Sequence, residues 1–258
     1  MTLGIVRLER FATVDSTQRV VEAWLEAGEP EICVAVADEQ IAGRGRRGRA
    51  WTAPPGMGLL LSVGFRPDDL PLRYGWRLAA IVALAMAEAA EGVLSLSPGT
   101  IRLKWPNDLV VDGPDGEPRK LAGVLGETVA RGGIVDHAVV GIGLNADWPR
   151  DAFPPALAGG MTSLRDAAGR PVDRDAVLDA FLDRLVARYP GWNAPAWEGR
   201  QRTTGAHVDV ATGEGLRRGH AAGVDSDTGA LLLTVDGDTL PIDSGDVIRC
   251  RVIVGRGV

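Results

Sequence analysis

Residues 100–113, TIRLKWPNDLVVDG, place two short apolar runs on either side of Pro106, Asn107 and Asp108. These three residues favour a tight turn, because proline fixes its φ angle and Asn and Asp side chains hydrogen-bond nearby backbone. The stretch therefore predicts strand, turn, strand. Asn107 can bind a polar ligand group there, and Asp108 can hold Mg²⁺ or accept a proton, although a purely structural turn would also explain both residues.

The neighbouring segments predict further strands and several helices. Strands are expected where apolar and β-branched residues run between turn residues, at 5–11, 31–40, 58–65, 120–129 and 135–147. Helices are expected where apolar residues recur with helical spacing, at 14–28, 74–92 and 173–190. Asp15 or Ser16 can cap the first of these helices, and Asp173 the last.

The pattern of apolar and turn residues changes near Gln201. From there to Val258 no helical period is found, and short strands alternate with turn residues such as those at 227–229. We expect a small all-β barrel over residues 201–258, joined by a linker at 191–203 to a larger domain formed by residues 1–200.

Composition narrows the class of protein. The chain has 258 residues and a formal net charge of -6, which argues against a general nucleic-acid binder. The N-terminus lacks a signal-peptide pattern, and the most apolar run, 78–90, is too short to span a bilayer. The two cysteines and three histidines show no metal-site spacing. These features favour a cytoplasmic protein without a membrane segment.

The most unusual segment is GRGRRGRAW, residues 43–51, which concentrates four arginines in an acidic chain. Its glycines match G-x-G-x-x-G, but Pro54 and Pro55 prevent the helix that a dinucleotide fingerprint needs. Arginines bind carboxylates and phosphates, and glycines let a backbone approach its ligand. We expect a mobile lid that a phosphate-bearing ligand orders. The alternative is an ordinary solvated basic loop.

Only two of the 28 basic residues are lysines, Lys104 and Lys120. An ammonium can act as a compact point charge where a planar guanidinium does not fit. Together with the loop arginines, Lys120 could reduce the repulsion between a carboxylate and the α-phosphate of ATP. The mixed anhydride so formed needs protection from water, which a closing lid would supply.

These motifs together resemble those of a biotin protein ligase, the class of enzyme that attaches biotin to carboxylase carrier domains. The resemblance rests on DSTQ at 15–18, GRGRRGRAW, KWPNDL at 104–109, KLAGVLGE at 120–127 and GIGLN at 141–145. It implies an α+β fold, with a mixed β-sheet flanked by helices like that of class II aminoacyl-tRNA synthetases. It also implies that the C-terminal segment is SH3-like.

The resemblance also implies roles for individual residues. Biotin would be bound by Ser16, Thr17, Gln40, Gly43, Arg44, Arg46, Lys120, Gly123, Gly141 and Gly143. The nucleotide would be bound by Arg46, Arg49, Trp51, Lys104, Asn107, Lys120 and Asn145. Arg46, Lys120 and Asp108 would be catalytic, and Asp108 is also the candidate ligand for the Mg²⁺ that accompanies ATP. Gln18 departs from the family's usual Asn, so its ligand contact is not implied.

The implied reaction has two steps. Biotin and ATP give biotinyl-5′-AMP and pyrophosphate, and a lysine of a carboxylase biotin carrier domain then attacks the adenylate. DSTQ begins at Asp15, so the resemblance implies a monofunctional ligase without a DNA-binding segment, acting as a monomer or weak homodimer. The alternatives are a lipoate protein ligase, a regulator that binds biotin or nucleotide without turnover, and a DNA binder that uses residues 44–49.

Overall fold

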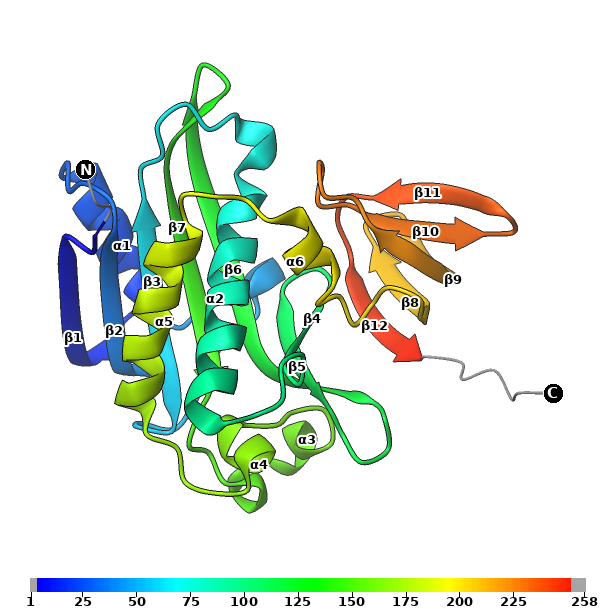
Figure 1. Cartoon of the computed structure of the whole chain (residues 1–258), viewed down its shortest axis with the longest axis horizontal. Coiled ribbons are helices and arrows are strands. Elements are labelled where there is room, and N and C mark those ends of the chain that lie inside the picture. Colours follow the sequence, from blue (N-terminus) through cyan, green and yellow to red (C-terminus); the bar gives the residue numbers. More distant parts are fainter. Residues whose placement is uncertain (1–3, 252–258) are drawn as a thin grey trace.

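The protein is described by a computed structural model over residues 4–251, which form two β-sheets with helices packed mainly on the larger one (Figure 1). The larger sheet has seven strands in the order β1-β2-β3-β7-β6-β5-β4. β1 and β2 are parallel and every other neighbouring pair is antiparallel, which confirms the expected mixed sheet. The strands are β1 (Arg7–Val14), β2 (Cys33–Gln40), β3 (Gly58–Phe65), β4 (Arg102–Lys104), β5 (Asp108–Asp112), β6 (Pro118–Arg131) and β7 (Ile134–Asn145).

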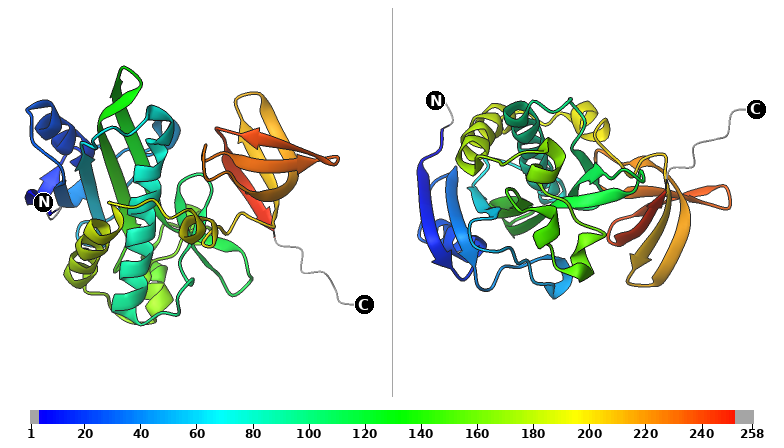
Figure 2. Two further views of the ribbon diagram at one scale, coloured as in Figure 1. Left: turned by 45° about the horizontal axis from the view of Figure 1, so that its top comes forward. Right: turned by 90° about the horizontal axis from the view of Figure 1, so that it is seen from below.

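Helices cover both faces of this sheet. On β2, Cys33 and Ala35 face α1 (Thr17–Glu26), whereas Val34 and Val36 belong to the core beneath α2 (Trp76–Leu94) and α5 (Arg174–Arg188). This division follows from the alternation of side chains along a strand. Figure 2 shows the two longer helices side by side against the sheet. The shorter helices are α3 (Pro155–Ala158), α4 (Leu164–Ala168), α6 (Ala194–Glu198) and the 3₁₀ turns at Arg46–Gly48, Leu72–Tyr74 and Arg150–Ala152.

Most predicted elements are found close to their expected positions. The helix predicted at 173–190 begins after Asp173, whose side chain accepts hydrogen bonds from the backbone of Asp175 and Ala176. The first strand lies at Arg7–Val14 rather than at 5–11. Ser16 precedes α1, but its side chain makes no capping hydrogen bond. Within residues 4–251, no helix combines the length and the apolar character needed to cross a membrane.

The second sheet is antiparallel, in the order β11-β10-β9-β8-β12. Its strands are β8 (His207–Thr212), β9 (Gly215–Val224), β10 (Leu231–Val235), β11 (Asp238–Ile242) and β12 (Asp246–Arg251). This antiparallel sheet is consistent with the expected SH3-like domain. Within the described residues it does not close into a barrel, because β11 and β12 lie at opposite edges and no ladder joins them. Pro241 on β11 lacks the N–H that a further ladder bond would need. Among the short strands expected in this segment, the last, DVIRCRVIV at 246–254, lies in part outside the described residues.

The predicted linker at 191–203 is not a free connection. It contains α6, and Trp197, Gln201, Arg202 and Thr203 are buried. The backbone N–H of Leu103 donates to the carbonyl of Arg200 (2.8 Å), and the N–H of Arg202 donates to the carbonyl of Leu103 (2.6 Å). The segment thus extends the edge of the larger sheet beside β4, which fixes the second sheet next to the turn at residues 105–108.

Candidate active site

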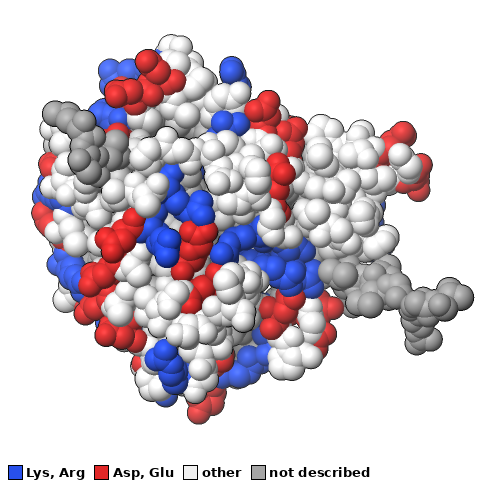
Figure 3. All heavy atoms as spheres, viewed as in Figure 1, with Lys and Arg blue, Asp and Glu red and all other residues white. Residues whose placement is uncertain are grey.

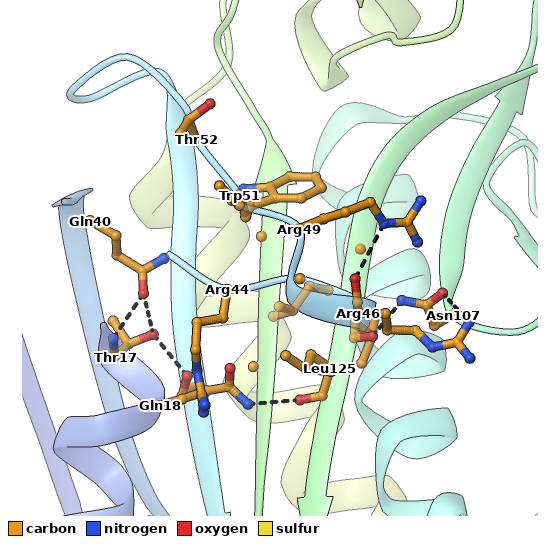
Figure 4. A pocket seen from close by; sticks show the side chains of 18 of the residues that line it. Thr17, Gln18, Gln40, Arg44, Arg46, Arg49, Trp51, Thr52, Asn107 and Leu125 are labelled. Carbon is orange, nitrogen blue, oxygen red and sulfur yellow. Dashed lines mark hydrogen bonds between the residues drawn. The ribbon is translucent and has the colours of Figure 1, made fainter. Parts of the chain in front are cut away.

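A cavity of about 200 Å³ lies on the α1 side of the larger sheet, beneath the arginine-rich loop. Its floor is formed where β6 and β7 carry glycine at Gly123, Gly141 and Gly143. Two ends can be distinguished in Figure 4: Thr17, Gln18 and Gln40 lie at one, and Arg46 and Asn107 at the other, with Trp51 above. We call this space the loop cavity.

The glycines of the floor are required by the position of Trp51. A Cβ atom on Gly143 would overlap the indole ring of Trp51, with Cδ1 only 2.8 Å away, and one on Gly123 would lie 3.2 Å from Cζ3. Real Cβ atoms do not approach other heavy atoms as closely as 2.8 Å. The indole ring therefore lies against bare backbone, which explains two glycines in adjacent central strands.

The loop itself is a small closed hairpin. Arg44 and Ala50 form a β-bridge, the N–H of Gly45 donates to the carbonyl of Arg49 (2.7 Å), and the N–H of Trp51 donates to the carbonyl of Gly43 (3.0 Å). A Cβ on Gly43 would overlap the Trp51 carbonyl oxygen, so this glycine is needed for loop closure. These contacts place the loop over the cavity.

Carboxylates from elsewhere in the chain hold the loop arginines. Asp246, on β12 of the second sheet, lies 3.0 Å from Arg46, 3.4 Å from Arg47 and 3.2 Å from Arg49. Arg46 also donates to the carbonyl of Gly245 (3.1 Å). Burial lowers the pKa of Arg46 below its ordinary value, and the charge of Asp246 opposes that shift. At the other end of the loop, Arg44 is ion-paired with Glu127 on β6.

The two lysines lie close to each other but make different contacts. Lys120 Nζ is 2.6 Å from Asp108 Oδ1 and 5.3 Å from the centre of the Trp51 ring. Lys104 Nζ donates to the carbonyl of Val247 at 2.6 Å. Burial lowers the pKa of Lys104, and the nearby Asp108 carboxylate opposes the shift.

The opposite end of the cavity carries neutral polar groups, with Arg44 as its cation. Gln40 Oε1 accepts hydrogen bonds from the backbone N–H and the hydroxyl of Thr17, at 2.8 and 3.2 Å. The Thr17 hydroxyl also lies 2.8 Å from the hydroxyl of Ser62. Gln18 is buried and donates through Nε2 to the carbonyl of Leu125 at 3.1 Å. This end suits a neutral ring that carries both donors and acceptors.

The charge pattern decides what the cavity can bind. Four cationic side chains line it, and among the described residues its lining includes no carboxylate. The partners of these cations, Asp108, Glu127 and Asp246, lie just outside. On the face shown in Figure 3, by contrast, basic and acidic side chains are interspersed. The cavity therefore concentrates positive charge, and its binding of an anionic group stays a prediction. Its cations are Arg44, Arg46, Arg49 and Lys120.

Eleven of the predicted site residues line the loop cavity: Thr17, Gln40, Arg44, Arg46, Arg49, Trp51, Asn107, Lys120, Gly123, Gly141 and Gly143. Five others do not. Ser16 is buried at the start of α1, and Gly43 lies beneath Trp51. Lys104 and Asp108 line a neighbouring cavity. Asn145 is fully buried, with Nδ2 donating to the carbonyl of Thr162 (2.9 Å) and Oδ1 unpartnered. Their ligand roles remain predictions.

Several residues of the site had no role in the sequence analysis. Ser62 is the one polar side chain in the strand GLLLSVGF, and a lone polar residue in an apolar strand could have indicated a site residue. Leu157 and Met161 line the cavity from a segment for which no element was predicted. Asp246 and Glu127 are remote from the loop in sequence, so only the fold reveals that they pair with it.

The residues around Asp108 do not form a metal site by themselves. Within residues 4–251, no group of three or more His, Cys, Asp or Glu side chains could hold an ion. Asp108 is already paired with Lys120. Mg²⁺ is commonly bound by one or two carboxylates together with substrate phosphates, and a single carboxylate fits that mode.

Comparison with known proteins agrees with the fold and the site. The profile of the Biotin/lipoate A/B protein ligase family matches residues 11–145. The chain is 34% identical to the biotin–[acetyl-CoA-carboxylase] ligase of Mycobacterium tuberculosis, covering 84% of this chain and 79% of that protein. It is 32% identical to the bifunctional ligase/repressor BirA of Bacillus spizizenii, covering 91% and 71% respectively.

The solved structures give the same result. A biotin protein ligase from Aquifex aeolicus, in complex with biotin and ATP, superimposes with a TM-score of 0.73 at 27% identity. The alignment covers 93% of this chain and 97% of that one. The chain therefore belongs to the biotin/lipoate A/B protein ligase family. Within that family its relatives are biotin protein ligases, which supports a biotin ligase rather than a lipoate ligase.

Proposed function

We propose that this chain forms biotinyl-5′-AMP from biotin and ATP in the loop cavity and transfers biotin to a lysine of a carboxylase biotin carrier domain. The observation that carries the proposal is the composition of the cavity. Its lining includes four cations and no carboxylate. Arg46, Arg49 and Lys120 lie towards Asp246 and Asp108. Arg44 lies beside Gln18, at the end that carries the neutral polar groups of Thr17, Gln18, Gln40 and Ser62. Such a cavity suits a molecule with a polar neutral ring and an anionic end.

In the first step, the biotin carboxylate attacks the α-phosphate of ATP and pyrophosphate leaves. Two anions must come together, and Arg46 and Lys120 reduce their repulsion because both line the same cavity. The close packing of Trp51 and the loop excludes water from the adenylate. Trp51 offers a flat surface for the adenine, with Leu157 and Met161 lining the same cavity.

In the second step, the carrier lysine attacks the acyl carbonyl and AMP leaves. Asp108 accepts the proton or orients the amine, because it lies 2.6 Å from Lys120 and so close to the carboxyl end of biotin. Mg²⁺ enters with ATP as part of the substrate. Asn107 and Asp108 border the place where the phosphates would lie.

The proposal extends to the roles of the two domains, the acceptor protein and the state in which the enzyme works. Residues 1–200 act as the catalytic domain and 201–258 as an SH3-like domain that supplies Asp246 to the loop. The acceptor is the carrier domain of an acyl-CoA carboxylase, and the protein works in the cytoplasm as a monomer or weak homodimer. The net charge of -6 gives no support for a DNA-binding role.

Pyrophosphate release on mixing the protein with biotin and Mg-ATP tests this proposal, with lipoate as the control acid. We expect pyrophosphate release with biotin but not with lipoate. When a carrier domain is then added, it should become labelled with biotin. Tight binding of biotin without pyrophosphate would instead identify a non-catalytic regulator.

A further inference from the structure

The second sheet brings two of the chain's three histidines together on its outer face. His207 on β8 and His220 on β9 lie directly opposite each other in the antiparallel register of these neighbouring strands (Figure 1). Val208 and Ala221, the next residues along each strand, are buried. Because side chains alternate along a strand, the two imidazoles project away from that buried face. His207 is exposed and His220 is half-buried, so solvent reaches both.

The two rings have a spacing that suits a shared metal ion. The ring centres of His207 and His220 are 5.5 Å apart, and the ring planes are inclined by 68°. An imidazole nitrogen binds Zn²⁺ at about 2.0–2.1 Å, which puts the centre of that ring on the order of 3 Å from the ion. An ion placed between the two rings is therefore within reach of one nitrogen from each.

The nitrogen atoms of this pair are not engaged elsewhere. Within residues 4–251, neither the His207 ring nor the His220 ring makes a hydrogen bond or an ion pair. The third histidine differs, because His137 Nδ1 lies 2.8 Å from a carboxylate oxygen of Asp136. A neutral imidazole has one nitrogen that carries a hydrogen and one with a free lone pair. The pair on the second sheet thus has two lone pairs available to an ion.

The ligands available decide the class of ion. Imidazole suits late first-row metals such as Zn²⁺, Ni²⁺ and Cu²⁺, whereas Mg²⁺ prefers oxygen ligands. The next cross-strand pair on the same face is Asp209 and Arg218, whose Oδ2 and Nε atoms lie 3.5 Å apart. No third His, Cys, Asp or Glu completes a metal-binding group in the described part of the chain. Water must supply the remaining ligands, so the bound ion is exchangeable.

We propose that His207 and His220 form a two-histidine site for a late first-row divalent metal ion, with Zn²⁺ as the probe that tests it. The ion ties β8 to β9, and β8 pairs with β12, the strand that carries Asp246. An ion that binds only the folded sheet stabilises it. Neither histidine lines the loop cavity or the cavity beside it, so the site is independent of the proposed ligase activity.

Titration of the full chain with ZnCl₂, followed through the imidazole resonances in NMR spectra, tests the proposal. The resonances of His207 and His220 are expected to shift together and to reach saturation at one ion per chain, while those of His137 stay in place. MgCl₂ should shift none of them, because Mg²⁺ prefers oxygen ligands. A Zn²⁺-induced shift of only one of the two histidines, or of neither, would overturn the proposal.

Variants of the two histidines locate the ion. Since chelation needs both rings, His207→Asn and His220→Asn should each weaken Zn²⁺ binding by roughly tenfold or more, and the double variant should be little weaker than either. His137→Asn is the control and should bind Zn²⁺ as the wild type does. Wild-type affinity in either single variant would show that the rings do not share an ion. An affinity that rises with chain concentration would place the ion between two chains, and the proposal would fail equally.

Discussion

Asp246 Oδ1 lies 3.0 Å from Arg46 Nη1, so that a carboxylate of the second sheet holds an arginine of the loop over the active site. The same carboxylate lies within 3.4 Å of Arg47 and Arg49. Asp246 is largely shielded from water, with 18% of its side chain exposed, so these contacts are less screened than ordinary surface ion pairs. The second sheet therefore positions the loop.

Removal of this carboxylate should loosen the loop. We expect Asp246→Ala to raise KM for ATP by about tenfold, equivalent to ~1.4 kcal/mol, a typical size for lost hydrogen bonds to a charged group. Trypsin should also cleave within residues 43–51 faster than in the wild type. Asp238→Asn is a matched control, because Asp238 is exposed on the same sheet and has no ion-pair partner among the described residues. Equal cleavage rates in Asp246→Ala and the wild type would contradict this role.

Lys120→Ala should remove adenylate formation and leave the fold intact. Lys120 is the only ammonium that lines the loop cavity, and loss of one group that stabilises developing charge costs roughly 10²–10³ in kcat. Pyrophosphate release measures the first step, and circular dichroism checks the fold. Arg119→Gln, at the preceding residue of β6, removes a cation that lies outside both cavities and should retain activity. Near-normal turnover in Lys120→Ala would defeat the assignment.

Gly143→Ala should displace Trp51, since the new Cβ would overlap the indole ring. We expect the free energy of unfolding to fall by about 1–3 kcal/mol, as for other overpacked sites, and KM for ATP to rise. Gly126→Ala on β6 is the matched control, because a Cβ there meets its nearest neighbour, Ala79 Cβ, at an ordinary 3.5 Å. Equal effects of the two substitutions on KM for ATP would show that Trp51 does not contribute to nucleotide binding.

Ionisation of Cys33 should lower the free energy of unfolding at alkaline pH. Burial raises the pKa of its thiol from 9.0 to about 11. Because the unfolded thiol ionises first, the contribution of Cys33 is fully present below pH 9 and is lost as pH rises toward 11. A shift of this size corresponds to about 2.7 kcal/mol when complete, of which about 2 kcal/mol is lost by pH 11.

Urea denaturation of the wild type and Cys33→Ala at pH 8 and pH 11 measures this effect. The wild type should lose about 2 kcal/mol more than the variant between the two values. Parallel losses in both proteins would show that the folded thiol ionises at its ordinary pKa.

Patterns in the sequence predicted several residues that the fold brings together around the loop cavity, where the prediction depends on local chemistry. The glycines of β6 and β7, the arginine-rich loop and Lys120 were all identified, because each combines an unusual residue with an interpretable neighbourhood. The strand and helix positions followed from apolar spacing in the same way. Gln18, for which the resemblance implied no ligand contact, also lines the cavity, and its Nε2 donates a hydrogen bond to the carbonyl of Leu125.

Contacts between distant segments could not be obtained in this way. Nothing near Asp246 distinguishes it from other surface carboxylates, and its pairing with Arg46 depends on how the two sheets meet. The small barrel is predicted from the alternation of short strands and turns and from the SH3-like resemblance, but closure depends on whether the outer strands can pair, and Pro241 limits that. The segment at 191–203 is predicted as a linker from its place between the two domains, although Trp197 and Gln201 are buried.

The pairing of Arg46 with Asp246 also bears on synthesis, since 200 residues separate the two partners. A ribosome makes the loop 200 residues before its carboxylate partner. A nascent chain consequently carries these guanidinium groups without Asp246 until that residue has been synthesised, and products truncated before it would lack the residue that fixes the loop in place.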